Sequence, residues 1–329
     1  MSNKKLIGFN EEEFREKVNP INQELVEDFL SQNHLSGQTL KQYKSALYIF
    51  CTWVHDNCKN KSIPELRPRD ARKYQDWLIA KGLSPSAIKF KRSAVSSLCG
   101  FIEVYYDKEY DNFRNIYTKA IPNVAKSAVK EKIPLTIKEL KKLTKELEKR
   151  EDWQKLAYVY FTYSTGCRRE ESRQLLKEVA SYSKAEDKDG NQKSYYITHS
   201  IRAKGKGREG KVRKFTFDEK AKVAMENWVK FRDTQVEKDD CPYMFVSKGK
   251  DGYRQISANT FNLWCQEFSK ILGGRPVHPH LFRSSRATNA VVDEGKSLSA
   301  VQKLLGHESS QTTEIYVVRN DEDDLDELY

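Results

Sequence analysis

The stretch LLGHESSQTTEIY, residues 304–316, carries the most specific signal in the chain. A helical apolar pattern ends at Gly306, and glycine closes helices well because it readily adopts a left-handed backbone conformation. His307 follows at once, and the polar segment 308–311 leads to a second short helix with Tyr316. His307 and Tyr316 lie nine residues apart across one turn and can converge on one small target. Taken alone, a helical hairpin with a half-exposed histidine and a packed tyrosine explains this stretch better.

The length and composition of the chain favour two folded domains that bind a polyanion. With 329 residues the chain exceeds one ordinary domain, and 38% apolar residues with 17 Tyr, 15 Phe and 5 Trp indicate a folded protein. The net charge is +11, although six acids lie in the last ten residues, NDEDDLDELY, and without those six negative charges the remainder carries +17. Such a charge favours nucleic acid as a partner, although a merely soluble basic protein fits the charge as well.

The cysteines and the apolar runs exclude several other classes of protein. The six cysteines form no CxxC pair and no Cys/His spacing typical of zinc, so we expect reduced, mostly buried thiols and neither a metal nor a cofactor. No apolar run is long enough to span a bilayer, and the first ten residues carry no signal-peptide pattern. The sequence therefore predicts a cytoplasmic, nucleoid-associated protein that does not enter a membrane.

Helical periodicity dominates the first part of the chain and predicts a helical DNA-binding domain over residues 21–120. Residues 1–20 are polar and are predicted as a flexible tail with one short helix. Helical patterns then begin near Asn22, in segment 36–57, after Pro68 and in segment 84–106.

Two local features of this first domain give specific expectations. In segment 36–57, Thr39 is the expected N-cap of the helix. The exposed faces of the domain carry basic residues, which are usually no more than a solvated surface. Because a second basic cluster lies further along the chain, we expect DNA contacts from Lys89, Lys91 and Arg92.

The remaining chain predicts a linker, a second domain and a tail. Residues 121–134 lack a sustained apolar period and are bracketed by prolines, as is typical of a linker. A second domain is predicted over residues 135–319, and an acidic tail over residues 320–329. Thr136 and Glu139 form a capping box at the start of the first helix of this domain.

A buried helix and a basic hairpin follow in the second domain. The apolar segment 153–164 predicts a buried helix, Gly166 ends it, and Arg168 begins the next helix, where it can reach a phosphate or form an ion pair with Glu171. The runs SYYITHSIRAK and KVRKFTF flank the turn GKGREG and predict a β-hairpin with Lys206 at its tip. Such a turn is also common for solubility alone. The expected DNA contacts of this hairpin are Arg202, Lys204, Arg208, Lys211 and Arg213.

His280 and Arg283 complete a set of groups suited to phosphoryl transfer. They stand at i and i+3, which places them on one helical face, although such a pair is also common as surface decoration. No carboxylate cluster that could hold Mg²⁺ accompanies them. The full set of candidate catalytic residues is Arg168, Lys206, His280, Arg283, His307 and Tyr316.

Each member of this set has an expected role in metal-free phosphoryl transfer. Tyr316 is the expected nucleophile, which would attack a backbone phosphate and form a covalent phosphotyrosine. Arg168 and Arg283 would neutralise the non-bridging oxygens in the transition state, and His307 would add a hydrogen bond to them. His280 would handle the proton of the tyrosine, and Lys206 would protonate the leaving 5′ oxygen.

This ordered set resembles the tyrosine recombinase, or phage integrase, family. The matching segments are TGCRREE, the GKG turn, HLFR and LLGHESSQTTEIY, together with TLKQYKSALYIF in the first domain and KIPLTIKEL at the start of the second. The resemblance implies a mainly helical fold with a small antiparallel β-sheet, formed by a helical SAM-like core-binding domain and a tyrosine-recombinase catalytic domain. It also implies a clamp around double-stranded DNA, in which four protomers exchange strands through a Holliday junction.

Three positions depart from the pattern of the family. Leu281 stands where an acid is common, Arg286 replaces an apolar residue, and residues 169–170 replace a small or apolar pair. None of these changes removes a catalytic group, but Arg286 could disturb the packing behind Arg283.

The sequence therefore predicts a site-specific DNA recombinase that acts through a 3′-phosphotyrosine intermediate. The alternative is a sequence-specific DNA-binding repressor of a phage or mobile element, which would keep the fold without the activity and bind as a monomer or dimer. A type IB topoisomerase would use similar chemistry, but the hairpin and the LLGH segment are more similar to those of the recombinases.

Overall fold

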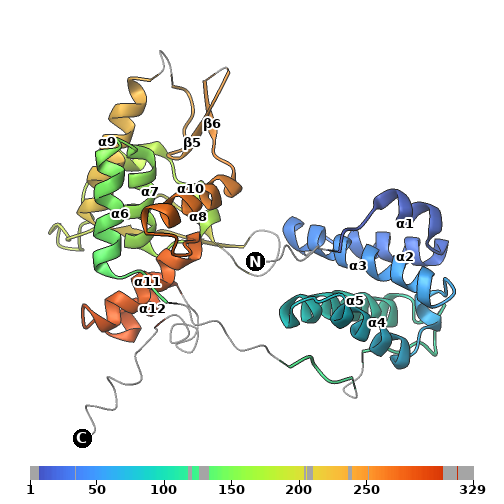
Figure 1. Cartoon of the computed structure of the whole chain (residues 1–329). Helices are drawn as coiled ribbons and strands as arrows, with labels where there is room; N and C mark the ends of the chain where they lie inside the picture. Colours follow the sequence, from blue (N-terminus) through green and yellow to red (C-terminus); the bar gives the residue numbers. More distant parts are fainter. Residues whose placement is uncertain are drawn as a thin grey trace, which may run out of the picture. The chain divides into compact units, whose positions relative to one another are not determined.

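The computed structural model describes residues 7–33, 35–117, 121–125, 133–203, 205, 210–235, 239–250, 252–306 and 317. These residues form two compact units, each with its own hydrophobic core. The first unit contains the described residues up to 125, and the second unit contains those from 133 onward. Figure 1 shows the helices and strands of both units.

The first unit is entirely helical in its described residues. Its elements are α1 (Glu11–Lys17), α2 (Pro20–Leu30), α3 (Gly37–Asn57), a 3-10 turn (Ile63–Glu65), α4 (Pro68–Ala80) and α5 (Pro85–Tyr105). The long helix α3 packs against α1, α2 and α5, and it buries the apolar face that the sequence predicts, with Leu47, Phe50 and Val54 fully enclosed. The first unit is therefore a bundle built around α3.

Two details of the first unit differ from the sequence-based expectations. The N-cap of α3 is Ser36 and not Thr39, because the helix begins three residues earlier and the Ser36 hydroxyl accepts a hydrogen bond from the Thr39 amide at 3.1 Å. Helix α1 is the short helix expected within residues 1–20, but it is not part of a flexible tail. Phe14 of α1 is fully buried and stacks on Tyr48 at 3.8 Å between ring centroids, so this helix belongs to the folded core.

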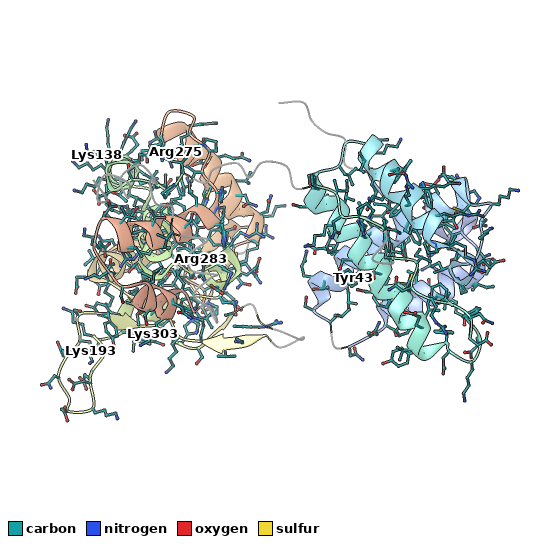
Figure 2. All side chains as sticks on the ribbon, turned by 90° about the horizontal axis from the view of Figure 1, so that it is seen from below. Tyr43, Lys138, Lys193, Arg275, Arg283 and Lys303 are labelled. Atoms are coloured by element: carbon teal, nitrogen blue, oxygen red, sulfur yellow. The ribbon has the colours of Figure 1, made fainter. Side chains whose placement is uncertain are left out.

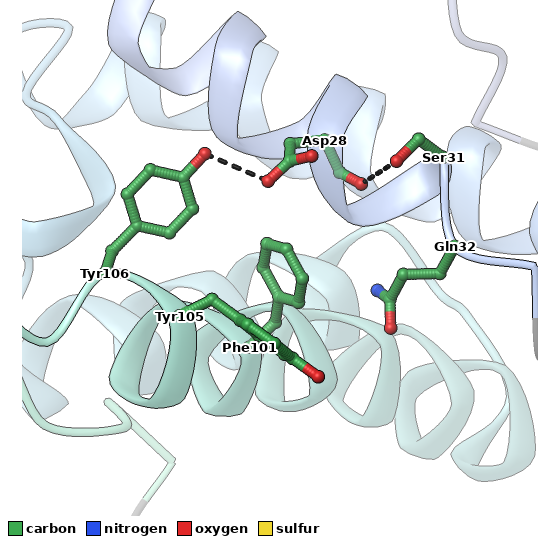
Figure 3. Close-up of a pocket in the computed structure, with 6 residues that line it drawn as sticks. All are labelled: Asp28, Ser31, Gln32, Phe101, Tyr105 and Tyr106. Carbon is green, nitrogen blue, oxygen red and sulfur yellow. Dashed lines mark hydrogen bonds between the residues drawn. The ribbon is translucent and has the colours of Figure 1, made fainter.

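A shallow hollow of about 490 Å³ opens between α2 and α5 of the first unit (Figure 3). Phe101, Tyr105 and Tyr106 line it together with Asp28, which accepts a hydrogen bond from the Tyr106 hydroxyl at 3.0 Å. Partial burial and this contact with Asp28 raise the pKa of Tyr106 to about 12. Tyr106 therefore stays protonated at neutral pH and is a poor nucleophile.

The second unit combines helices with short strands. Its elements are α6 (Ile137–Lys149), α7 (Trp153–Thr165), α8 (Arg169–Arg173), a 3-10 turn (Lys177–Ser181), β1 (Tyr196–Ile197), β2 (Ile201–Ala203), β3 (Lys211–Arg213), β4 (Thr216–Phe217), α9 (Glu219–Asp233), β5 (Val246–Gly249), β6 (Gly252–Gln255), α10 (Ala258–Ile271), α11 (Pro279–Val292) and α12 (Leu298–Leu305). The predicted capping box of α6 is present.

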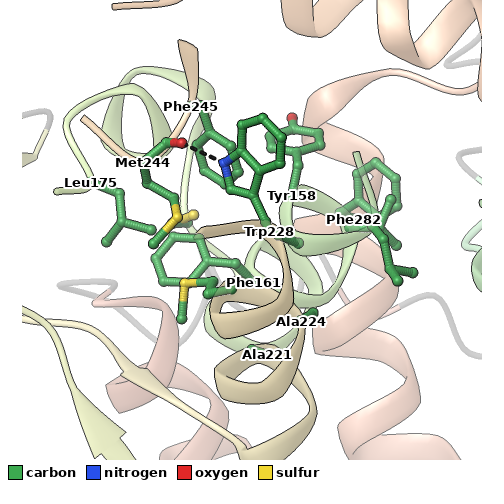
Figure 4. Close-up of a cluster of buried hydrophobic side chains, with 14 of the residues drawn as sticks. Tyr158, Phe161, Leu175, Ala221, Ala224, Trp228, Met244, Phe245 and Phe282 are labelled. Atoms are coloured by element: carbon green, nitrogen blue, oxygen red, sulfur yellow. Dashed lines mark hydrogen bonds between the residues drawn. The ribbon is translucent and has the colours of Figure 1, made fainter. Parts of the chain in front are cut away.

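Helix α7 runs through the core of the second unit, as its apolar sequence predicts. It packs against α6, α9, α11 and β4, and the side chains of Tyr158 and Phe161 are fully buried (Figure 4). On α9, Trp228 donates a hydrogen bond to the carbonyl oxygen of Met244 at 2.8 Å, so its polar atom is satisfied inside the core. This core fixes the end of α7, which is followed by Gly166 and Arg168.

Among the described residues, the strands form three antiparallel pairs, each separate from the others. The predicted hairpin is present as β1–β4 and β2–β3, with Tyr196 opposite Phe217 and Ile201 opposite Arg213. The pair β5–β6 was not predicted from the sequence. The expected class, mainly helical with a small amount of antiparallel strand, is confirmed.

The cysteines agree with the expectation of reduced, mostly buried thiols. Within the described residues, no helix is long and apolar enough to cross a bilayer. All six cysteines are free thiols, and five of them are buried.

Candidate active site

Three of the six candidate catalytic residues lie within the described part of the chain. These are Arg168, His280 and Arg283. The other three, namely Lys206, His307 and Tyr316, lie outside the described residues, as do the expected DNA contacts Lys204 and Arg208 and the expected short helix with Tyr316.

Arg283 lies on α11 and is enclosed by three segments of the second unit. Its side chain is fully buried, and one terminal nitrogen, Nη1, donates a hydrogen bond to the Gly166 carbonyl oxygen at 2.6 Å. The other terminal nitrogen, Nη2, donates to the Leu305 carbonyl oxygen at 2.8 Å. Arg283, which Figure 2 labels, therefore links the turn after α7 to the end of α12.

Arg168 follows Gly166 by two residues and is the N-cap of α8. Its backbone amide donates to Glu171 Oε2 at 2.5 Å, and its Nη1 lies 3.1 Å from Glu171 Oε1. The side chain of Arg168 is 30% exposed, whereas that of Glu171 is only 2% exposed. The ion pair between Arg168 and Glu171, which the sequence offers as the alternative to a phosphate contact, is therefore present. Part of the Arg168 side chain also reaches the surface.

His280 lies in the first turn of α11, directly after Pro279, the first residue of this helix. It is half-buried and stands one turn before Arg283, as the i, i+3 spacing predicts. The start of a helix carries a partial positive charge that favours an anion. A phosphate that approached Arg283 from this end of α11 would meet His280 and the dipole together.

Arg213 on β3 takes a different position from the one expected. We predicted a DNA contact, but its Nη1 and Nη2 donate to the carbonyl oxygens of Leu305 and Leu304, at 2.5 and 2.6 Å. Its guanidinium also stacks on Phe215, 4.2 Å from the ring centroid. Burial lowers the pKa of Arg213, and Arg168 lowers it further, so the two guanidinium groups interact electrostatically.

One backbone atom, the carbonyl oxygen of Leu305, joins these segments. It accepts hydrogen bonds from both Arg213 and Arg283. Gly166 approaches the same residue so closely that a Cβ atom at Gly166 would overlap Leu305 Cδ2. Arg168 forms an ion pair with the buried carboxylate of Glu171, and Arg213 interacts with it electrostatically. With Arg283 at the shared Leu305 carbonyl, this part of the unit carries an excess of positive charge that suits an anion such as a phosphate.

The chain returns to this region at Val317, the residue after Tyr316. Val317 packs against a small apolar cluster between α11 and α12 that includes Ala287, Val301 and Leu305. The cluster lies beside the Leu305 carbonyl. Val317 therefore lies against the same two helices, α11 and α12, that Arg283 links.

The basic residues of α5 differ in their surroundings. Lys89 is exposed, and Lys91 is half-buried with a pKa that burial lowers. Arg92 instead donates to the carbonyl oxygens of Ile121 and Pro122, at 3.2 and 2.8 Å, and to the side chain of Gln75. These bonds tie Arg92 to the end of the first unit.

The hairpin residues Arg202 on β2 and Lys211 on β3 are exposed. In the strand pair, Arg202 lies opposite Val212, and Lys211 lies opposite Ala203. The backbone of Arg202 is fixed by Gln174, whose amide side chain bonds both its N–H and its carbonyl oxygen. Both side chains remain candidates for contacts with DNA.

The departures from the family pattern leave Arg283 undisturbed. Arg286 forms an ion pair with Glu294 at 2.5 Å and lies over the ring of Tyr163, so it does not crowd the core behind Arg283. Leu281 is buried in the core of the second unit. Sequence reasoning missed the inward role of Arg213, because its two acceptors lie more than ninety residues further along the chain.

Comparison with known protein families identifies the chain. Residues 134–323, more than half of the chain, match the model of the phage integrase family. The chain belongs to the phage integrase family. Residues 23–103 also match the N-terminal SAM-like domain of phage integrases, which confirms the resemblance drawn from the sequence motifs.

Curated relatives of this phage integrase family member cover nearly its whole length. It is 28% identical over 319 residues to the SPbeta prophage-derived recombinase-like protein YomM of Bacillus subtilis, which covers 95% of this chain and 92% of the relative. It is also 27% identical over 302 residues to the tyrosine recombinase XerA of Pyrococcus furiosus, covering 92% and 91%.

Solved structures share the fold of this family member. The Tn1549 transposon integrase in complex with circular intermediate DNA is similar with a TM-score of 0.65 and 17% identity, covering 94% of this chain and 99% of that one. The lambda integrase tetramer bound to a Holliday junction is similar with a TM-score of 0.61 and 17% identity, covering 90% and 76%.

Proposed function

We propose that this phage integrase family member is a site-specific DNA recombinase that breaks and rejoins strands through a covalent 3′-phosphotyrosine. One observation carries the proposal. Arg283 and Arg213, whose strand follows Lys206 in the sequence, both donate hydrogen bonds to the carbonyl oxygen of Leu305, two residues before His307. This junction brings several positive charges to a point from which the chain continues to His307.

In the proposed reaction, Tyr316 attacks a backbone phosphate and the 5′ oxygen leaves. Arg168 and Arg283 stabilise the negative charge of the non-bridging oxygens, and such preorganised charge is usually the largest contribution to catalysis. His307 adds a hydrogen bond to the same oxygens.

Proton transfer in this reaction is divided between two groups. His280, in the first turn of α11, accepts the proton of the tyrosine, and Lys206 protonates the leaving oxygen. The tyrosine needs such help because its unperturbed pKa of about 10 leaves it protonated at neutral pH. The covalent intermediate conserves the energy of the broken bond for religation.

Double-stranded DNA is the proposed partner, and a homotetramer on DNA is the proposed active form. The net charge of +11 favours a polyanion, and two similar structures are described as complexes with DNA, one of them a tetramer. The exposed residues Lys89, Arg202 and Lys211, together with half-buried Lys91, supply the proposed contacts with DNA.

The domain limits belong to the same proposal. We assign DNA binding to residues 21–120 and catalysis to residues 135–319, with a linker at 121–134 and an acidic tail at 320–329. The reaction on chromosomal or phage DNA places the protein in the cytoplasm, at the nucleoid.

A second candidate function is a DNA-binding repressor that keeps the fold without the activity. One observation favours it, namely that the terminal nitrogens of Arg283 are engaged by the carbonyl oxygens of Gly166 and Leu305 and that the side chain is fully buried. In this case Arg283 would serve as a structural link, and the protein would bind as a monomer or dimer.

Covalent trapping separates the two functions. Duplex DNA is first selected from a randomised library by binding to the wild-type protein, and it is then synthesised with a nick, so that cleavage releases a short strand and traps the intermediate. The recombinase predicts a protein–DNA band on a denaturing gel with the wild type and none with Tyr316→Phe. Specific binding without a covalent band for the wild type would refute the recombinase and support the repressor.

A further inference from the structure

Arg213 connects two parts of the second unit that are far apart in the sequence. We propose that Arg213 is a positioning residue for phosphoryl transfer, which fixes the direction in which the chain leaves α12 toward His307. It also ties the strand of the Lys206 hairpin to this helix end. The inference rests on the proposed recombinase function and concerns a residue that does not itself contact the reacting phosphate.

The contacts of Arg213 match the chemistry of a helix end. The last carbonyl oxygens of a helix have no partner within the helix and carry a partial negative charge. One terminal nitrogen of Arg213 donates a hydrogen bond to the carbonyl oxygen of Leu304, and the other donates to that of Leu305, at 2.6 and 2.5 Å. Because the guanidinium is a rigid planar fork, these two bonds fix both the position and the orientation of the helix end.

The side chain of Arg213 is held in place from its other side as well. It stacks on Phe215, which is almost fully buried, and its backbone pairs with Ile201 of β2. Arg213 is half-buried, and this burial lowers its pKa. Both terminal nitrogens are thus directed at the end of α12.

Gly306 shows how closely Arg213 approaches the point where the chain leaves α12. Gly306 has a φ of 65° and closes the helix, and a Cβ atom at this position would overlap Nη1 of Arg213. Glycine is therefore required twice, once by the left-handed backbone and once by the guanidinium. The next residue in the chain is His307, so Arg213 lies beside the backbone position that immediately precedes this histidine.

Arg213 is connected to three candidate catalytic residues, namely Lys206, Arg283 and His307. Its strand begins directly after the turn that carries Lys206, and its acceptor Leu305 is shared with Arg283. A displacement of about 1 Å at a catalytic group can cost roughly 100-fold in rate. Loss of the fork at residue 213 should therefore slow the chemical step while leaving DNA binding almost unchanged.

The test compares Arg213→Lys with the wild type on the nicked duplex used for trapping. Lysine keeps the charge, but its single nitrogen cannot reproduce the fork. We expect the rate constant of covalent-complex formation at saturating DNA to fall roughly 100-fold, with little change in the Kd for the intact duplex. Lys220→Met, which removes an exposed charge from α9, is the matched control and should change neither quantity.

Two results would overturn the proposal. A weaker Kd with an unchanged rate at saturation, and a slope of log K against log salt reduced by about 1 in Arg213→Met, would make Arg213 a DNA contact. A lower Tm with an unchanged rate, measured well below that Tm, would make it a purely structural residue. Both alternatives leave the rate constant at saturating DNA unchanged, so a fall in this rate constant supports the positioning role alone.

A second experiment tests the contact without catalysis. Gly306→Ala is introduced into the wild type and into Arg213→Ala, and the Tm of all four proteins is measured. We expect Gly306→Ala to lower the Tm more in the wild type than in Arg213→Ala, because the overlap with the guanidinium is absent in the latter. Equal losses would refute the contact.

Failure of this proposal can be told from failure of the proposed function. If the wild type forms no covalent product, the recombinase function fails and the positioning role fails with it. If the wild type and Arg213→Lys form the product at the same rate, only the role of Arg213 is rejected.

Discussion

Gly166→Ala should destabilise the second unit by an amount that the structure allows us to divide into two parts. Gly166 closes α7 with a φ of 59°, and placing alanine in this left-handed conformation costs about 1–2 kcal/mol. The new Cβ atom would also overlap Leu305 Cδ2, and because Leu305 is fully buried it has little room to move. Overpacking of this kind costs about 1–3 kcal/mol, so the total is about 2–5 kcal/mol.

Gly273→Ala provides a matched control in the same unit. Gly273 follows α10, has a φ of 76° and has no atom within 4 Å of the position of a Cβ, so alanine there meets only the backbone cost of about 1–2 kcal/mol. Urea unfolding followed by circular dichroism, with the transition of the second unit fitted in both variants, measures the difference. If Gly166→Ala is no less stable than Gly273→Ala, Leu305 is not locked against Gly166 and the proposed junction is wrong.

The other predictions concern buried and basic groups. Burial raises the pKa of Asp239, but hydrogen bonds from Arg232 and Lys177 outweigh this effect and hold the pKa below its usual value. The contribution of Asp239 to the stability of the folded state is therefore present above about pH 4 and is lost as the pH falls through the folded-state pKa. Asp239→Asn leaves Arg232 buried without its carboxylate and should cost about 3–5 kcal/mol in urea unfolding at pH 7, a loss that shrinks in acid; an unchanged stability would refute this. Lys91→Met should weaken DNA binding and reduce the salt slope by about 1 without lowering the Tm, and an unchanged slope would remove Lys91 from the interface. Arg92→Ala should do the reverse, lowering the Tm of the first unit with little effect on the salt slope, because Arg92 bonds to backbone carbonyls; a reduced salt slope without a loss of Tm would contradict this.

The sequence predicts the helices well because their signals are local. The apolar run of α7 and the capping box at Thr136 are each specified by residues within one or two turns. The start of α3 was placed three residues late, since Ser36 and Thr39 are equally good caps by composition and only the backbone conformation distinguishes them. The short pair β5–β6 was missed, because four-residue strands with few apolar residues give almost no periodic signal.

The directions of the basic side chains could not be predicted in the same way. Arg92 and Arg213 have the charge and spacing of DNA contacts, yet both donate to backbone carbonyls supplied by distant segments. A long cationic side chain turns inward when the folded chain offers unpaired acceptors, and the sequence does not show where these acceptors lie. Arg283 was assigned to the site by its motif, but its enclosure by Gly166 and Leu305 required the structure.

The shared acceptor at Leu305 has a consequence for how this family should vary. Both guanidinium groups bond to main-chain oxygen atoms, which every amino acid supplies, so the bonds themselves do not depend on which side chains stand at residues 304 and 305. Substitutions at the donor and acceptor positions then have no reason to occur together during evolution. We expect the coupling between the hairpin and the end of α12 to leave no trace of correlated mutation at these positions, even where it governs the rate of strand cleavage.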